Sequence, residues 1–319
     1  MLEQTVSKFP KNPCVKVKRD GQWKGWTYEE FYNDVKSFAN GLISLGINNY
    51  KALNIIGFND PAWFMTFFGC IFANVLPVGV YTTNGPEACQ YIAEHSEAEI
   101  VIVENKSHLV KYLKEWDKLP KLKYIAIYND TVPADLPANR KGQVLTFDEL
   151  LNIGRQYAKE SRGETLQARK EKQKPGNCCT LVYTSGTTGL PKAVMLSHDN
   201  YTWLAYAFQK QYDHVLTYDN PEQFRSVSYL PLSHVAAQFT EMVVPLSRGA
   251  CIYFALPTAL QGSLIETLKE VRPDFLLSVP RLWEKIEETL KNMSKTNGFL
   301  KKSLGIIEFV IFFANYLFS

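Results

Sequence analysis

The sequence is poor in the features that mark several classes of protein. Only six of its 319 residues are cysteine, which is too few for a disulfide scaffold, and none is spaced with a histidine as in a zinc site. Thus no metal site is predicted. The 35 basic residues exceed the 32 acidic ones by three, a formal net charge of +3. So small a surplus predicts no nucleic-acid partner, which needs a clustered basic face.

Membrane and export signals are also lacking. Residues 1–5 show no basic stretch followed by an apolar one, so no signal peptide is predicted and the expected location is the cytoplasm. The apolar run 62–81 is interrupted by polar residues and by Pro77. The run 305–318 is shorter than the ~20 residues that a membrane span needs.

What is present is an alternation of helix and strand patterns. Thr27 and Thr146 each stand three residues before a glutamate, the capping-box pattern of a helix start. Alternation of this kind predicts an α/β fold, with layered, parallel-rich sheets covered by helices. The predicted helices are 27–45, 61–74, 86–95, 106–116 and 147–159, and the predicted strands are 52–58, 76–81, 100–103 and 124–128.

The alternation stops between residues 160 and 177. This stretch is rich in Lys, Arg, Glu and Gln and has no apolar periodicity, so it is interpreted as a solvated linker. Contact of its positive charges with an acidic lipid surface is the alternative. The predicted organisation is therefore a first α/β subdomain over 1–159, the linker over 160–177, a second subdomain over 178–299 and an apolar tail over 300–319.

A loop dense in hydroxyl groups follows the predicted strand 178–183. A polyphosphate site needs converging donors, a backbone that approaches the oxygens closely, and a cation. Here the glycines open the backbone, four hydroxyl side chains supply donors and one lysine supplies the charge. The candidate phosphate-binding residues are Thr184, Ser185, Gly186, Thr187, Thr188, Gly189, Leu190, Pro191 and Lys192. The spacing differs from a Walker A loop. The competing interpretation is a polar hairpin between two strands.

The segment 183–198 resembles the phosphate-binding motif of the adenylate-forming superfamily. Segment 228–234, Ser-Tyr-Leu-Pro-Leu-Ser-His, is similar to the strand-to-helix segment whose histidine borders the acyl-adenylate pocket. Segment 278–285 resembles the turn that lines the acyl channel of fatty acyl-CoA synthetases. Together with Asp60-Pro61-Ala62-Trp63, these motifs are most similar to bubblegum-type long-chain acyl-CoA synthetases, over about residues 23–292.

The resemblance implies an incomplete N-terminal adenylation domain of an ATP-dependent fatty acyl-CoA ligase. In this family a carboxylate attacks the α-phosphorus of Mg²⁺-ATP, and the thiol of coenzyme A then displaces AMP. The resemblance assigns the β- and γ-phosphates to Thr184 through Lys192. It assigns a long-chain fatty acid to an acyl and adenylate pocket formed by His234, Val235, Gln238, Val279 and Pro280. A capping or core-edge role is the other interpretation of His234.

Three positions depart from the family pattern. Ala193 stands where the family usually has glycine after the motif lysine; if that position needs a positive φ or a close backbone approach, the Cβ costs of order 1 kcal/mol and displaces Lys192. Gln238 stands where bacterial long-chain relatives have a gating aromatic. The third departure is length: the adenine segment, the ribose-binding aspartate and the catalytic lysine are not found after residue 292.

Three hypotheses follow. The first is that the chain is the N-terminal part, or a short isoform, of a fatty acyl-CoA ligase. The second is a catalytically inactive form that binds fatty acid or pairs with a full-length synthetase. The third is an unstable product without a role of its own. The tail is expected to cover exposed apolar surface or to contact a membrane peripherally. Aryl-CoA ligase and peptide-synthetase adenylation remain open among the enzymes, because only segments 228–238 and 278–285 favour fatty acids.

Overall fold

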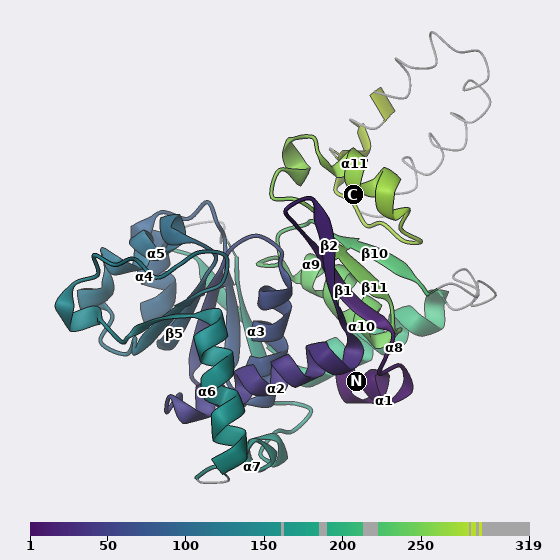
Figure 1. Cartoon of the computed structure of the whole chain (residues 1–319). Helices are drawn as coiled ribbons and strands as arrows, with labels where there is room; N and C mark the ends of the chain where they lie inside the picture. The colour runs from purple at the N-terminus through teal and green to yellow at the C-terminus, as the bar shows by residue number, and fades with distance from the viewer. Residues whose placement is uncertain (161–162, 185–189, 213–222, 281, 285–286, 289–319) are drawn as a thin grey trace, which may run out of the picture. The chain divides into compact units, whose positions relative to one another are not determined.

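The computed structural model describes residues 1–160, 163–184, 190–212, 223–280, 282–284 and 287–288. The chain divides into two compact units, Met1–Asp274 and Phe275–Ser319. Figure 1 follows the chain by residue number through the helices and strands of both units. The first unit contains both sheets of the described chain.

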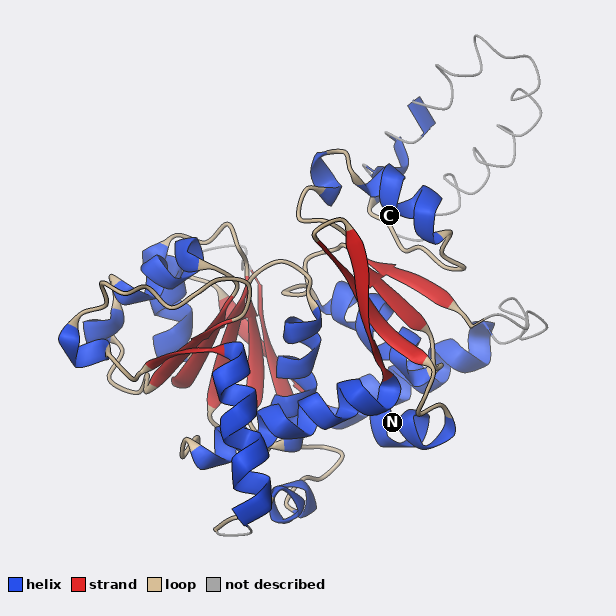
Figure 2. Ribbon diagram, in the orientation of Figure 1, coloured by secondary structure: helices blue, strands red, loops and turns tan. Residues whose placement is uncertain are grey.

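Seven strands form the larger sheet, in the order β7-β6-β5-β3-β4-β8-β9. Neighbouring strands are parallel except β8 and β9, which form an antiparallel pair. Every residue of the central strands β3 (Ala52–Ile56) and β5 (Ala98–Val103) is buried, as expected for parallel strands with helices on both faces (Figure 2). The other strands are β4 (Leu76–Val80), β6 (Tyr124–Ile127), β7 (Val144–Thr146), β8 (Cys178–Thr184) and β9 (Lys192–Ser197).

The helices of the first half begin where the capping signals predict. Thr27 Oγ1 accepts a hydrogen bond from the amide of Glu30 at 3.2 Å, and the Glu30 carboxylate accepts one from the amide of Thr27 at 2.8 Å. Thr146 and Glu149 repeat this reciprocal arrangement. The predicted α/β class is therefore confirmed. The helices are α1 (Leu2–Lys8), α2 (Tyr28–Ser44), α3 (Pro61–Phe72), α4 (Pro86–His95), α5 (Lys106–Leu113) and α6 (Phe147–Glu160).

Four strands form the smaller sheet, in the order β10-β11-β1-β2. The hairpin of β1 (Pro13–Arg19) and β2 (Gln22–Thr27) pairs through β1 with β11 (Cys251–Phe254), which pairs with β10 (Arg225–Ser228). The helical segments of this half are α8 (His198–Tyr212), α9 (Val235–Ala237), the π-helix η3 (Gln238–Val243), α10 (Val244–Ser247) and α11 (Leu264–Val271). Each sheet thus contains strands from both sides of the predicted linker, so the linker does not separate the sheets.

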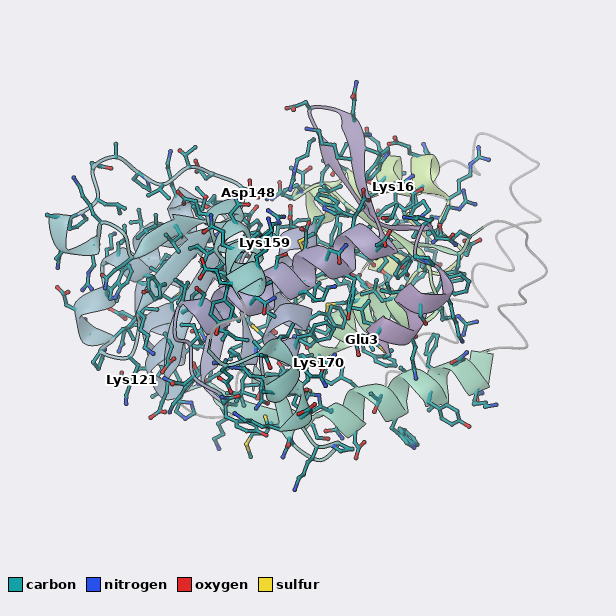
Figure 3. The ribbon with its side chains drawn as sticks, turned by 60° about the horizontal axis from the view of Figure 1, so that its bottom comes forward. Glu3, Lys16, Lys121, Asp148, Lys159 and Lys170 are labelled. Carbon is teal, nitrogen blue, oxygen red and sulfur yellow. The ribbon has the colours of Figure 1, made fainter. Side chains whose placement is uncertain are left out.

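The segment predicted to be a solvated linker is part of the first unit and packs on α2 and α3. It contains α7 (Leu166–Glu171), whose Arg169 is only 4% exposed. Arg169 donates one hydrogen bond to the Ala73 carbonyl at 3.1 Å and one to the Glu164 carboxylate at 2.8 Å. Lys170 pairs with Glu3 of α1 (Figure 3). Polar contacts hold this segment in place, among them the Arg169 guanidinium at the C-terminus of α3. Contacts of this kind leave no apolar periodicity in the sequence.

No helix in the described ranges is long and apolar enough to span a membrane. The apolar run 62–81 consists of α3 and β4, as its proline and polar interruptions predict. The tail 300–319 lies outside the described residues. In the second unit, residues 280, 282–284 and 287–288 are helical, and the amides of Leu282 and Trp283 both donate to the Val279 carbonyl.

Candidate active site

The candidate site lies where two neighbouring parallel strands of the larger sheet end. β4 and β8 pair in parallel, with Gly79 opposite Val182. The two strands therefore end at the same edge of the sheet, β4 at Val80 and β8 at Thr184. Ligands of open α/β sheets bind outside the carboxyl ends of the strands. The predicted phosphate loop leaves β8 at this edge.

The β8–β9 hairpin brings the two described ends of this loop together. Thr184 and Lys192 are paired across the hairpin, and both are exposed. The hydroxyl of Tyr91 donates to the carbonyl of Pro191 at 3.1 Å and so anchors the returning strand to α4. Leu190, also part of the predicted motif, is 64% exposed. The motif residues Ser185, Gly186, Thr187, Thr188 and Gly189 lie outside the described residues.

The outgoing strand is anchored to the same helix. The Tyr183 hydroxyl and His95 Nδ1 of α4 are 2.8 Å apart. Burial raises the pKa of Tyr183 to about 12, so its phenol stays protonated at neutral pH. The two ends of the loop are therefore held at a fixed separation by one helix.

Ala193 fits the hairpin without strain. It lies in β9 opposite Tyr183, and it is not among the described non-glycine residues with a positive φ. Its side chain packs against the core cluster of the larger sheet. The penalty that a positive φ would impose at this position therefore does not arise, and Lys192 begins a regular strand.

His234 reaches the same edge of the sheet from the turn that follows β10. Its amide donates to the Pro231 carbonyl at 2.9 Å, and its ring lies edge-on to that of Tyr81, with ring centroids 5.9 Å apart. Tyr81 is the residue directly after β4. Gly79 allows the turn to approach β4, because a Cβ there would lie only 2.7 Å from Cα of Ser233. The exposed His234 is thus placed beside Tyr81, at the end of the strand that neighbours β8 and the predicted phosphate loop.

Gln238 is buried beneath this turn, although the sequence placed it in the pocket. It is 1% exposed. Its Oε1 accepts a hydrogen bond from the Tyr201 hydroxyl at 2.5 Å, and its Nε2 donates one to the Leu232 carbonyl at 2.8 Å. Both polar ends of the amide are therefore used inside the protein, where they brace the turn.

An open cavity of about 630 Å³ lies beside Val235, between α8 and the start of α9. Val235 is 40% exposed and Trp203 is 67% exposed. Small-molecule sites typically have volumes of ~300–1,000 Å³ and mainly apolar walls. The cavity is lined by Leu196, Asp199, Asn200, Tyr201, Trp203, Leu204, Val235 and Phe239. Of the predicted pocket residues of the first unit, only Val235 lines it.

The other two predicted pocket residues belong to the second unit. Val279 is 46% exposed, and its carbonyl accepts the amides of the helical turn that follows. Pro280 is the first helical residue of that turn. Their assignment to the acyl pocket stays a prediction.

A buried carboxylate that no sequence motif predicted lies on η3, that of Glu241. Glu241 is 3% exposed and accepts hydrogen bonds from the amides of Tyr229 and Leu230 at 2.9 and 3.0 Å. Its other donors are the Ser228 hydroxyl at 3.0 Å and the Asn59 amide at 3.3 Å. Burial raises the pKa of Glu241 to about 8, an effect that the amides of Leu230 and Tyr229 and the Ser228 hydroxyl oppose. The signal in the sequence was a lone acidic residue in the apolar run 239–246.

The fold, the hairpin and the turn together define an adenylate-forming domain, and the comparisons agree. The sequence pattern of the AMP-binding enzyme family matches residues 2–316. The chain therefore belongs to this family. Among experimental structures, the adenylation and carrier didomain of a Segniliparus rugosus carboxylic acid reductase, with AMP bound, matches 93% of this chain and 44% of its own. Its TM-score is 0.74 at 19% identity.

Curated sequences similar to this chain include long-chain-fatty-acid–CoA ligases of two vertebrate species. The chain is 40% identical to the long-chain-fatty-acid–CoA ligase ACSBG2 of Xenopus laevis, over 96% of this chain and 40% of the relative. It is 38% identical to ACSBG1 of Homo sapiens, over 95% of this chain and 40% of the relative. The resemblance to long-chain acyl-CoA synthetases of this type is thus confirmed. The chain spans about two fifths of the length of these relatives.

Proposed function

We propose that this chain binds Mg²⁺-ATP and a long-chain fatty acid, and supplies these two sites to an ATP-dependent fatty acyl-CoA ligase. One observation supports the proposal: the β8–β9 hairpin and the turn with His234 lie at the carboxyl ends of the neighbouring strands β8 and β4, at one edge of the larger sheet. Carboxylate adenylation needs two neighbouring sites of this kind, because a carboxylate and a triphosphate must be held together against their mutual repulsion.

Each end of the site has its own task. Lys192 offers an ammonium group and Thr184 a hydroxyl to the β- and γ-phosphates, and Mg²⁺ arrives as part of the substrate complex. In the described chain, no group of three His, Cys, Asp or Glu residues could hold a metal ion. His234 flanks the fatty-acid carboxylate, and Val235 leads from it to the apolar cavity. Coenzyme A enters in the second half-reaction, when its thiol displaces AMP.

The experiment is a pair of binding titrations followed by a turnover assay on the same protein. Calorimetric titration with Mg²⁺-ATP and with a long-chain fatty acid should each give saturable binding to the 319-residue chain. Addition of coenzyme A then tests for release of AMP. Binding with turnover supports the ligase, and binding without turnover favours a form that acts with a full-length synthetase. Absence of binding by either ligand contradicts the proposal.

The proposal extends to the setting of the protein. Long-chain fatty acids partition into membranes. We therefore propose that the protein is located in the cytoplasm and contacts internal membranes peripherally. Fractionation of cells that express the chain tests this: recovery in the cytosol and in salt-washable membrane fractions agrees with it. Retention in membranes after a carbonate wash contradicts it.

A further inference from the structure

The carboxylate of Glu241 accepts hydrogen bonds from two segments that are far apart in the sequence, residues 228–230 and Asn59. It accepts the amides of Tyr229 and Leu230, which directly follow β10. It also accepts the Ser228 hydroxyl from the end of that strand. The amide group of Asn59 reaches it from the turn between β3 and α3. Every one of these contacts is a donor to the side chain, so the two carboxyl oxygens act as acceptors for all of them.

Asn59 ties this cluster to the larger sheet. Besides contacting Glu241, its Nδ2 lies 2.8 Å from Ser228 Oγ and 2.8 Å from the Leu230 carbonyl. Asn59 is 4% exposed and follows β3, the central strand of that sheet. The start of the turn after β10 is therefore held from two sides, by η3 and by the larger sheet.

The rest of the turn depends on this fixed start. After Leu230 the chain runs four residues to His234, supported by the Gln238 amide on the Leu232 carbonyl and by the close passage of Ser233 over Gly79. Glu241 lies on η3, and π-helical segments are frequent at functional sites. The wider helical turn carries both Gln238 and Glu241 with buried side chains beneath the same turn.

We propose that Glu241, seated by Asn59, is a positioning residue that fixes the turn 229–234 and thereby holds His234 at the fatty-acid end of the site. The ligand assignment in this statement rests on the proposed function. This arrangement of Glu241 and Asn59, called the Glu241 clamp below, contacts the turn and not the β8–β9 hairpin. Its loss therefore weakens binding of the fatty acid and spares binding of Mg²⁺-ATP.

The test compares Glu241→Gln with Glu99→Gln in the full chain. Glu99 is a buried carboxylate away from the site and serves as the control: it is 4% exposed, accepts the amide of Asn48 at 2.9 Å at the amino end of β5, and also pairs with Lys123 at 3.0 Å. Hydrogen exchange reports the amides that each carboxylate holds. Glu241→Gln should lower protection at Tyr229 and Leu230 roughly tenfold, whereas Glu99→Gln should lower it at Asn48 alone.

Two further readouts separate positioning from mere stability. In Glu241→Gln the NMR signals of the His234 ring should lose the shift caused by the Tyr81 ring, and affinity for a long-chain fatty acid should fall roughly tenfold. Affinity for Mg²⁺-ATP should stay within about twofold. Ser228→Ala, which removes one donor and keeps the carboxylate, should show the same changes at smaller amplitude. It carries the test if Glu241→Gln does not fold.

Unchanged exchange at residues 229 and 230, together with an unchanged His234 spectrum in both variants, overturns the clamp. Equal losses of fatty-acid affinity in Glu241→Gln and Glu99→Gln overturn it too. If the wild-type chain binds neither ligand, the proposed function fails, while exchange and the His234 spectrum still decide the clamp. A clamp that fails in a chain that binds both ligands leaves the proposed function standing.

Discussion

Replacing Gly79 with alanine should displace the turn that carries His234. A Cβ at this position would lie 2.7 Å from Cα of Ser233, whereas ordinary contacts begin at 3.4 Å. The obstacle is backbone, so a shift of about 0.7 Å is needed, and no side-chain rotation can provide it. Alanine in a strand is otherwise no less stable than glycine. The steric clash therefore makes the substitution destabilising. Overpacking of this kind costs about 1–3 kcal/mol.

The assay is urea unfolding of wild type, Gly79→Ala and a control, Gly176→Ala. Gly176 has no atom within 4 Å of its would-be Cβ and no positive φ, so the control should stay within about 0.5 kcal/mol of wild type. Gly79→Ala should lose about 1–3 kcal/mol of unfolding free energy, and its His234–Tyr81 ring contact should change in NMR spectra. Wild-type stability with an unchanged His234 spectrum would refute the argued packing of the turn on β4.

Two further predictions concern stability. Arg169→Met should lower the free energy of unfolding by about 1–3 kcal/mol in urea denaturation, because it leaves the Ala73 carbonyl without its donor; a change under 0.5 kcal/mol would contradict the anchoring of α7. Burial lowers the pKa of His108 to about 4, below the ~6.5 expected in the unfolded chain. Between these two pH values the unfolded state binds one more proton than the folded state. The free energy of unfolding therefore falls as the pH drops from 6.5 to 4. His108→Gln should reduce the total loss over this range by roughly 2–3 kcal/mol in pH-dependent melts, and parallel wild-type and variant profiles would refute the assignment.

The sequence predicts the first half of the fold well because its signals are local. The capping residues Thr27, Asp60 and Thr146 act within one helical turn, so pattern and structure agree there. The β1–β2 hairpin was missed although it has a local signal, the Asp20-Gly21 turn with two positive φ angles. The pairing of β1 with β11 was missed because it joins residues more than 200 positions apart. No local pattern signals such a pairing.

The site was predicted unevenly for the same reason. Thr184 and Lys192 lie on one hairpin, so their proximity follows from the sequence alone. Gln238 was assigned by its distance from His234 along the chain, but the π-helix turns it inward to Tyr201. Glu241 was missed because its donors come from other elements, and their convergence appears only in three dimensions.

The most direct test of the account is the affinity of the full chain for Mg²⁺-ATP in Lys192→Ala. Lys121, labelled in Figure 3, is the control. It is exposed and lies before the amino end of β6, whereas the candidate site lies at the carboxyl ends of β4 and β8 in the same sheet. Loss of a charge-assisted phosphate contact predicts a roughly 10- to 100-fold weaker affinity for Lys192→Ala, and Lys121→Ala should match wild type. Equal, unaltered affinities in both variants would contradict the assignment of the β8–β9 hairpin to the phosphates.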